Sequence, residues 1–273
     1  MSLSLLYPIG STEQRVVTIM LLAIDVGNTQ TVIGVYVRGS LVRMWRVTTN
    51  RLDTADELRV KLMPLFESEG LSLSEVKQAC LASVVPQLTD AWRHAVADAS
   101  GAETIVCTAE SAADLFAANY PRPHEIGADR VADAVAACSL YGAPVVVVDF
   151  GTATNIEVID SEGAFIGGII APGVQTSAQA LFSHASRLSA IDLVAPVQAI
   201  GVSTETAIQS GIVLGEADRI DGLIRRIFDQ LGYEATVVAT GGLAPLIARH
   251  SATINHINSE LTIEGLRLIA EAS

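Results

Sequence analysis

The stretch from Val145 to Thr154, Val-Val-Val-Val-Asp-Phe-Gly-Thr-Ala-Thr, runs from four consecutive valines into a polar turn. A short apolar run that ends at such residues is typical of a buried β-strand followed by a tight turn. A similar sequence occurs 124 positions earlier, where Leu-Leu-Ala-Ile leads into residues 25–29, Asp-Val-Gly-Asn-Thr. Gly39 and Gly163 each lie 14 residues beyond the Asp of their copy, and each predicts a hairpin turn. The chain therefore contains a duplicated strand–turn–strand unit.

Both turns of this unit offer groups that suit a phosphate. An ionised Asp at the end of a buried strand needs a partner, and Gly lets a backbone approach a ligand closely. Asn28, Thr29 and Thr31 follow the first Asp, and Thr152 and Thr154 follow the second. An Asx-turn between two strands would explain either copy alone. Two copies favour a nucleotide site between two half-domains.

Length and composition limit the possible classes of protein. The chain has 273 residues, half of them hydrophobic, but no apolar run long enough to span a membrane. No basic region followed by an apolar stretch opens the chain, so we expect a cytoplasmic protein without a membrane segment. Residues 1–19 differ in character from the rest and are expected to be an extension or tag. Residues 20–142 and 143–273 are expected to form two lobes.

The charge balance argues against nucleic acid as a partner. The net charge is −13, and only two of the 17 basic residues are lysines. A site for an anionic ligand must therefore be local, built from backbone N–H groups, a few arginines and metal ions. The three cysteines form no Cys-x-x-Cys pair and are expected to be reduced thiols, and the five histidines show no metal-binding spacing.

Strands and helices alternate along the chain, which predicts an α/β protein with mixed sheets. Thr54 and Glu57 form a capping-box pattern, and Gly211, Gly215 and Gly222 would allow close packing of a long helix. Helices are predicted over residues 53–69, 87–99, 111–118, 127–140, 174–184, 205–231 and 260–272, and further strands over 79–85, 104–108 and 235–240.

Residues 127–130, Gly-Ala-Asp-Arg, open one of these predicted helices. An acid at a helix N-terminus is favoured by the helix dipole, which would give Asp129 a purely structural role. The alternative is a carboxylate that accepts a proton from an alcohol, beside an arginine that binds a carboxylate or phosphate. No Walker-type phosphate loop occurs in the sequence.

The two Asp-x-Gly turns resemble the paired phosphate motifs of the actin, hexokinase and sugar-kinase superfamily. Thr240-Gly241-Gly242, after a predicted strand, resembles the glycine motif on the nucleoside side of the same site. This resemblance implies ATP binding and a fold of two duplicated ribonuclease-H-like (actin-like ATPase) lobes, with mixed β-sheets flanked by helices.

A set of motifs in one order narrows the resemblance to type III pantothenate kinase, from about Met20 to the C-terminus. The set comprises residues 25–29, Tyr120 with residues 127–130, residues 149–154, residues 167–173 (Gly-Gly-Ile-Ile-Ala-Pro-Gly) and residues 204–211 (Thr-Glu-Thr-Ala-Ile-Gln-Ser-Gly). Members of this family transfer the γ-phosphate of ATP to the hydroxyl of pantothenate, the first step towards coenzyme A.

The resemblance also implies roles for single residues and for partners. Asp129 would be the proton acceptor, Asp149 would bind a monovalent cation (potassium or ammonium), and Mg²⁺ would accompany ATP. A homodimer with active sites at the subunit interface is implied, so Thr204 would serve the partner's site. ATP would contact Asp25, Val26, Gly27, Asn28, Thr29, Gln30, Thr31, Val32 and Thr152, and pantothenate would contact Tyr120, Gly127, Ala128, Asp129, Arg130 and Thr204.

Three positions depart from the family pattern, and two other functions compete. Val202 stands where the family commonly has Lys, Asn155 where Thr is usual, and Ser189 where Pro is typical. Another kinase of the superfamily, such as a small sugar kinase, would share both turns but not the Gly-Ala-Asp-Arg motif. An ATP-dependent transcriptional regulator would need a DNA-binding segment before the first turn and a less acidic chain.

Overall fold

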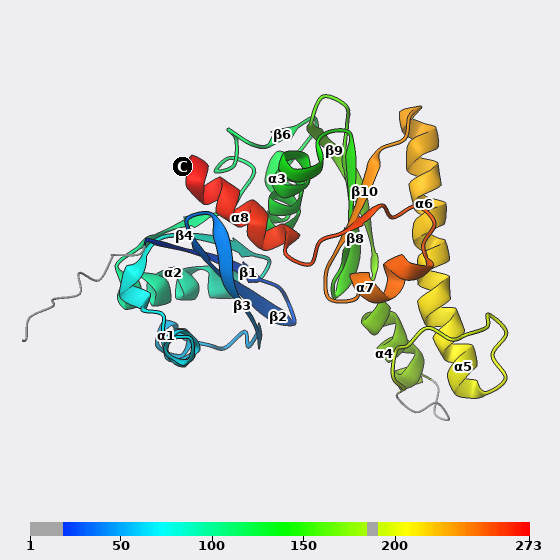
Figure 1. The fold of residues 1–273 in the computed structure, drawn as a ribbon, viewed down its shortest axis with the longest axis horizontal. Helices are drawn as coiled ribbons and strands as arrows, with labels where there is room; N and C mark the ends of the chain where they lie inside the picture. Colours follow the sequence, from blue (N-terminus) through cyan, green and yellow to red (C-terminus); the bar gives the residue numbers. More distant parts are fainter. Residues whose placement is uncertain (1–18, 185–190) are drawn as a thin grey trace, which may run out of the picture.

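The chain forms two β-sheets that share an order of five strands, and the second sheet has a sixth strand, β6, beside β9 (Figure 1). The structure is a computed structural model and describes residues 19–184 and 191–273. The first sheet has the order β3-β2-β1-β4-β5, and the second has the order β11-β10-β7-β8-β9-β6. The strands of the first sheet are β1 (Met20–Val26), β2 (Gln30–Val37), β3 (Ser40–Thr48), β4 (Val76–Ser83) and β5 (Glu103–Val106). Those of the second are β6 (Ala117–Ala118), β7 (Val145–Phe150), β8 (Ala153–Ile159), β9 (Ala164–Pro172), β10 (Thr236–Thr240) and β11 (His256–Ile257).

Strand direction confirms that the fold is a duplication. In each sheet three antiparallel strands, β1–β2–β3 or β7–β8–β9, are extended by parallel strands on the side of the first one. Both predicted hairpin turns are present: Arg38 and Gly39 have φ values of 51° and 75°, and Gly163 has 81°. The mixed sheets and the repeated order are those expected from the two Asp-x-Gly turns.

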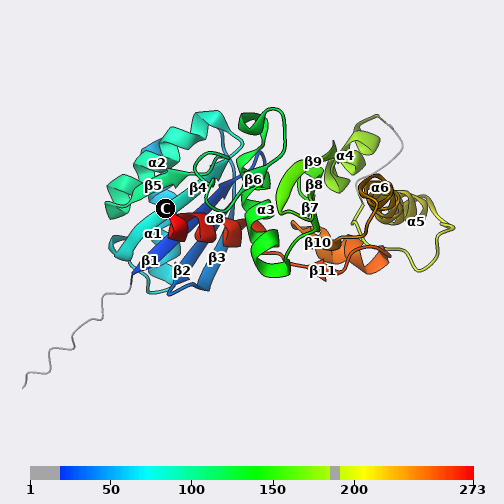
Figure 2. The same ribbon diagram turned by 90° about the horizontal axis from the view of Figure 1, so that it is seen from above.

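Two helices, α3 (Ala128–Tyr141) and α8 (Leu261–Ala272), lie between the sheets in both views (Figure 2). Helix α8 packs against β1, β4 and β2, and α3 packs against β7, β8 and β4. One hydrophobic cluster includes residues of both helices and of both sheets. The outer faces of the sheets are covered by α1 (Ala55–Ser68) and α2 (Pro86–Ser100) on one side and by α6 (Gly215–Leu231) on the other.

Each half of the chain contributes one element to the sheet that is formed mainly by the other half. Strand β6 precedes residue 142 but pairs with β9 of the second sheet, and α8 lies near the C-terminus but covers the first sheet. The expected division into lobes at residue 142 stays a prediction. The expected N-terminal extension lies almost wholly outside the described residues, as does Ser189.

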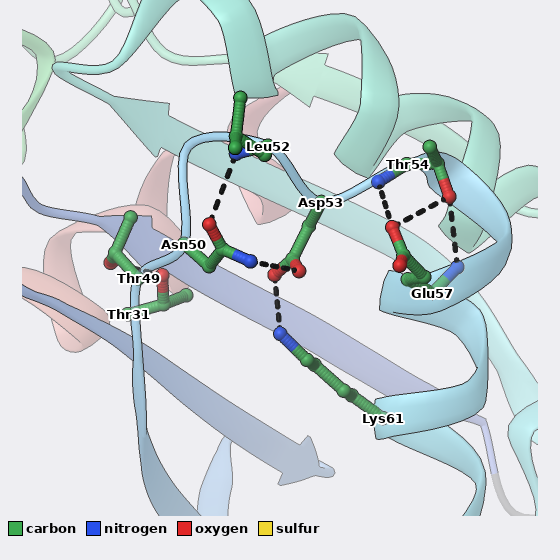
Figure 3. Close-up of polar contacts among 8 residues, drawn as sticks. All are labelled: Thr31, Thr49, Asn50, Leu52, Asp53, Thr54, Glu57 and Lys61. Carbon is green, nitrogen blue, oxygen red and sulfur yellow. Dashed lines mark hydrogen bonds and ion pairs between the residues drawn. The ribbon is translucent and has the colours of Figure 1, made fainter.

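Several predicted elements are confirmed with small shifts at their ends. Helix α1 begins with a reciprocal capping box: the Glu57 amide donates to Thr54 Oγ1 (3.3 Å), and the Thr54 amide donates to Glu57 Oε2 (2.8 Å; Figure 3). The strand predicted over 79–85 is β4, which ends at Ser83, and Pro86 is the first residue of α2. The remaining helical segments are η1 (Leu73–Glu75), η2 (Pro123–Glu125), α4 (Val174–His184), α5 (Thr204–Gln209), η3 (Ser210–Leu214), α7 (Ala244–Ile247) and η4 (Ala248–His250).

One helix prediction was wrong. Residues 111–118 form turns and strand β6, because Thr108 and Ser111 bond each other's backbone amides and Ala117 pairs with Ala164 of β9. The helix predicted over 205–231 is confirmed as a continuous helical segment from Thr204 to Leu231, in which η3 is a π-helical turn. A Cβ added to any of the three glycines expected to allow close packing there would have no neighbouring atom within 4 Å, so none is needed for packing within the described residues.

Close packing on a glycine occurs instead where α3 crosses α8. A Cβ added to Gly265 would lie 1.9 Å from the backbone oxygen of Ala132, so the two helices touch through their backbones. We expect Gly265→Ala to lower the free energy of unfolding by about 1–3 kcal/mol, because it overfills this contact. Urea unfolding measures the change.

Gly222→Ala in α6 is the matched control, because nothing lies within 4 Å of its added Cβ. There the substitution removes a helical glycine and should stabilise the protein by about 0.5–1 kcal/mol. Equal effects of the two substitutions would contradict the close crossing at Gly265.

Candidate active site

A cavity of about 480 Å³ lies where β1, β7 and β10 end and α8 begins. The predicted ATP-binding residues of the first turn that line it are Asp25, Gly27, Asn28, Thr29, Gln30 and Val32. The second turn contributes Asp149, Gly151 and Thr152, and the third motif contributes Thr240, Gly241 and Gly242. Segments separated by more than 200 residues therefore meet at one cavity, and Asp129 from the start of α3 also lines it.

The two Asp-x-Gly turns contact each other directly across this cavity. The hydroxyls of Thr29 and Thr152 are 3.0 Å apart. In each turn the glycine amide donates a backbone hydrogen bond of 3.0 Å to a residue further along the chain, from Gly27 N to Gln30 O and from Gly151 N to Ala153 O. The acceptor lies three residues on in the first turn and two residues on in the second. The sequence duplication is thus a pair of facing turns that present hydroxyl groups to the same space.

A glycine of the third motif makes room for Asp149. Gly241 has a φ of 87°, and a Cβ there would lie 2.4 Å from Asp149 Oδ1. Only a residue without a side chain fits this contact comfortably. The end of β10 is thereby brought against the end of β7, and its backbone faces the cavity.

The loop after β3 supports the first turn (Figure 3), and the sequence did not reveal this. The Thr49 amide donates to Thr29 O (3.0 Å), and the hydroxyls of Thr31 and Thr49 are 2.9 Å apart. Arg51 Nη2 donates to Asn28 Oδ1 (2.8 Å). The loop itself is held by Asn50, whose side chain bonds Leu52 N and Asp53 (3.2 and 3.0 Å).

Three carboxyl groups, those of Asp25, Asp129 and Asp149, face the cavity and influence one another. Burial and the charges of Asp129 and Asp149 raise the pKa of Asp25 well above its ordinary value. Burial, followed by the charge of Asp129, raises the pKa of Asp149 to about 7. Convergent carboxylates of this kind disfavour their common ionisation unless a cation joins them.

Asp129 is placed by the first turn of α3. Its Oδ1 accepts a hydrogen bond from the Arg130 amide (2.9 Å), and a Cβ on Gly127 would lie 2.5 Å from that oxygen. Burial raises the pKa of Asp129, while the Arg130 amide and guanidinium oppose the rise. A carboxyl group with a raised pKa is a better proton acceptor than an ordinary one.

The predicted pantothenate-binding residues Tyr120 and Arg130 meet at a third residue, Phe165. The Tyr120 ring meets the Phe165 ring edge-on with centroids 5.7 Å apart, and the Arg130 guanidinium lies 5.3 Å from the Phe165 centroid. Arg130 Nε donates to Glu157 Oε1 (2.9 Å). Glu157 was missed from the sequence, although a lone Glu within the apolar strand β8 was a signal.

Tyr120 and Arg130 do not line the cavity, and neither do the remaining predicted site residues Val26, Thr31, Gly127, Ala128 and Thr204. The side chain of Val26 is buried in the core behind the first turn, and Thr31 is 2% exposed. Gly127 and Ala128 adjoin Asp129 at the start of α3. Thr204 begins α5 and is exposed, and α5 and β6 lie far apart in both views. Within one copy of the chain, Thr204 is not brought to Tyr120.

The carboxylates of the cavity suit hard cations whose coordination is completed by atoms of a bound ligand. Among the described residues no group of three or more His, Cys, Asp or Glu side chains is arranged to hold a metal ion alone. Mg²⁺ is commonly bound by one or two carboxylates together with substrate phosphates and water. Asp25 and Asp149, deep in a cavity beside two phosphate-type turns, fit that pattern.

Facing Asp-x-Gly turns, a glycine motif after a third strand and two sheets of one order define an ATP-binding protein of the actin-like fold. Solved structures share this fold: MreB 5 of Spiroplasma citri bound to AMPPNP has a TM-score of 0.54 and 12% identity, covering 93% of this chain and 97% of its own. The ethanolamine utilization protein EutJ from Carboxydothermus hydrogenoformans has a TM-score of 0.53 and 18% identity, covering 92% and 89%.

Sequence relatives carry the identification further. The type III pantothenate kinase family matches residues 21–226. The type III pantothenate kinase of Desulfosudis oleivorans is 43% identical over 93% of this chain and 100% of its own length, and that of Thermomicrobium roseum is 44% identical over 91% and 95%. The chain belongs to the type III pantothenate kinase family, so it is an ATP-dependent pantothenate kinase of coenzyme A biosynthesis. No helix among the described residues is long and apolar enough to cross a membrane.

The acidic cluster makes the ligand-free protein sensitive to pH. Burial raises the pKa of Asp149 from 3.8 to about 7 and that of Glu157 from 4.5 to about 8. At pH values between the ordinary and the raised pKa of each group, the folded chain binds more protons than the unfolded one. We therefore expect the free energy of unfolding to fall as pH rises from about 5 to about 8. Urea unfolding in a buffer without Mg²⁺, potassium or ATP measures it.

Glu157→Gln removes one of these titrating groups and should make the fall with pH smaller. A free energy of unfolding that rises over the same pH range would contradict the raised pKa values of the cluster.

Proposed function

We propose that Asp129 is the general base that accepts the proton from the pantothenate hydroxyl. The hydroxyl oxygen bonds to the γ-phosphorus as its O–H bond breaks, and the bond from the γ-phosphorus to the bridging oxygen breaks to release ADP. The observation that carries this proposal is the position of Asp129, at the start of α3 beside the cavity where the two phosphate-type turns meet. Its raised pKa suits a proton acceptor near neutral pH.

The two turns are proposed to hold the phosphates of ATP. Backbone and side-chain donors of residues 25–32 approach from the first sheet, and the hydroxyl of Thr152 approaches from the second. Phosphoryl transfer requires mainly alignment of the reacting atoms and stabilisation of charge. Arg46 and Arg51, at the edge of the first turn, add positive charge that the turn itself lacks.

Asp25 and Asp149 are proposed to bind cations that accompany ATP. When bound, Mg²⁺ and a monovalent cation would neutralise the phosphates and the carboxylates that face them. Asp149 is the ligand proposed for the monovalent ion, because Gly241 leaves space beside its Oδ1 and Gly151 beside its Oδ2. Without a cation, burial and neighbouring charge oppose ionisation of both groups.

A homodimer with shared active sites is part of the proposal. Thr204 lies outside the cavity of its own chain, so a contact with pantothenate requires a second copy. Large apolar side chains are exposed just before α5, at Val194, Val197, Ile200 and Val202, and such a patch is typical of an interaction surface. Light scattering that detects only monomers under assay conditions would refute the shared site.

Asp129→Asn tests the general base. The substitution keeps the shape and the hydrogen bond from the Arg130 amide but removes the proton acceptor, so we expect kcat to fall by about 10²–10⁴-fold. Release of ADP in the presence of pantothenate measures kcat. A variant that phosphorylates pantothenate at nearly the wild-type rate would show that Asp129 is not the base.

Asp133→Asn is the matched control for this experiment. Asp133 lies one turn further along α3, is 2% exposed and accepts a hydrogen bond from Thr262 Oγ1 (2.7 Å), which an amide oxygen would also accept. Loss of a second buried carboxylate from the same helix should leave most of the activity.

The monovalent cation is tested by replacement of salts. We expect ADP release with pantothenate to be faster in potassium or ammonium than in sodium, and to be slow in every salt when pantothenate is absent. Asp149→Asn should weaken the preference among the salts, because one carboxylate is lost from the proposed site. Equal rates of the wild-type protein in all three salts would contradict a monovalent-cation site.

A further inference from the structure

Arg130 is held against the β8–β9 pair by three contacts. Its Nε donates to Glu157 Oε1, its guanidinium lies over the Phe165 ring, and a Cβ on Gly168 would lie 2.5 Å from Nη2. Glu157 and Gly168 are directly opposite each other in the β8–β9 register. One cross-strand pair therefore supplies both the carboxylate that binds the guanidinium and the space that it occupies.

Glu157 is an unusual residue for its position. Its side chain is fully buried and stands between the apolar residues Ile156 and Val158 of β8, and Arg130 is 14% exposed. Glu157 Oε2 has no hydrogen-bond partner among the described residues. Burial of a carboxylate is costly, and a buried ion pair often stabilises a fold less than apolar residues of the same size. Stability alone is therefore a poor explanation for Glu157.

The contact to Glu157 determines which edge of Arg130 remains available. A guanidinium has five N–H donors, and an acceptor can bind it through Nε and one Nη or through both Nη atoms. Nε is taken by Glu157, and no described residue accepts a hydrogen bond from Nη1 or Nη2. The terminal edge is left with four N–H donors, and the guanidinium lies over the Phe165 ring, which the Tyr120 ring meets edge-on.

We propose that Glu157 is a positioning residue for the acceptor substrate: it fixes the Arg130 guanidinium so that Nη1 and Nη2 bind the carboxylate of pantothenate. The proposal rests on the contact between Arg130 and pantothenate that the family resemblance implies and that we propose for this chain. Glu157 touches neither substrate and acts only through Arg130. Its loss should therefore weaken binding of the acceptor without a comparable effect on ATP.

Glu157→Met and Glu157→Gln separate this role from a purely structural one. Met has a similar volume but cannot accept from Arg130 Nε, whereas the Gln oxygen can. We expect Glu157→Met to raise the KM for pantothenate by about tenfold or more, the size of a lost charge-assisted hydrogen bond, and to leave the KM for ATP within about threefold of wild type. Glu157→Gln should restore most of the affinity for pantothenate.

The chain contains a matched control. Arg267 on α8 donates from Nε to Glu264 (3.1 Å) and lies 5.7 Å from the Tyr36 ring centroid, which is a similar arginine–glutamate–aromatic contact away from Asp129. Its Nη1 and Nη2 are bonded to Glu271 and Glu264, so unlike Arg130 it leaves no terminal edge available. Glu264→Met should not change the KM for pantothenate. Thermal unfolding of each variant shows whether it is folded. If Glu157→Met does not fold, Glu157→Asp replaces it, because the shorter side chain withdraws the carboxylate from Nε and should also raise the KM for pantothenate.

A double substitution distinguishes the positioning role of Glu157 from the contact between Arg130 and pantothenate on which it rests. Arg130→Ala should raise the KM for pantothenate, and adding Glu157→Met to it should change that KM by less than about twofold, because the two residues act as one unit. If Arg130→Ala raises the KM but neither folded Glu157→Met nor folded Glu157→Asp does, the positioning role is wrong and the Arg130 contact stands. If Arg130→Ala leaves the KM unchanged, the proposed contact is wrong, and the role of Glu157 is wrong with it. Equal increases in the KM values for ATP and pantothenate would also overturn the positioning role.

Discussion

The backbone contact between α3 and α8 at Ala132 and Gly265 determines how the two sheets sit relative to each other. Helix α8 packs on the first sheet, α3 packs on strands of both sheets, and the two helices pack on each other, so their separation sets the distance between the ends of β1 and β7. That distance allows the hydroxyls of Thr29 and Thr152 to meet. A bulkier residue at the crossing would move whole sheets, because close-packed interiors transmit displacement rather than absorb it.

In the active site, two sheets of similar strand order carry two copies of the Asp-x-Gly turn, and the two turns have different neighbours. In both turns the glycine amide donates the closing bond, but Asp149 is enclosed by Gly241 whereas the first turn is supported by the loop at Thr49 and Arg51. Asp129 belongs to neither copy and reaches the cavity because α3 starts at its edge. Duplication thus provides the frame and the phosphate-type turns, and the segment inserted between the copies provides the acid and the arginine.

Much of this arrangement could be predicted from the sequence. Repeats of apolar strands before Asp-x-Gly reveal the two sheets, because burial and turn chemistry are local properties of the chain. The capping box at Thr54 and the start of α3 at Gly127 follow from local rules in the same way. The structure of residues 111–118 could not be predicted by local rules, because strand pairing with Ala164 overrides a weak helical tendency. The supporting contacts of Thr49, Arg51 and Glu157 depend on tertiary neighbours, so only the oddity of a Glu in an apolar strand indicated any of them.

The exchange of α8 has a consequence for synthesis of the protein. The first sheet is complete once residue 106 has been made, yet the helix that covers its inner face comprises residues 261–272. On the ribosome this sheet therefore waits for the final segment of the chain with apolar residues of β1 and β4 uncovered. Domains that are continuous in sequence can fold one after another during translation. Here the inner face of the first sheet is covered only once α8 has been made, shortly after β10 and β11 of the second sheet, so both sheets are completed late and nearly together.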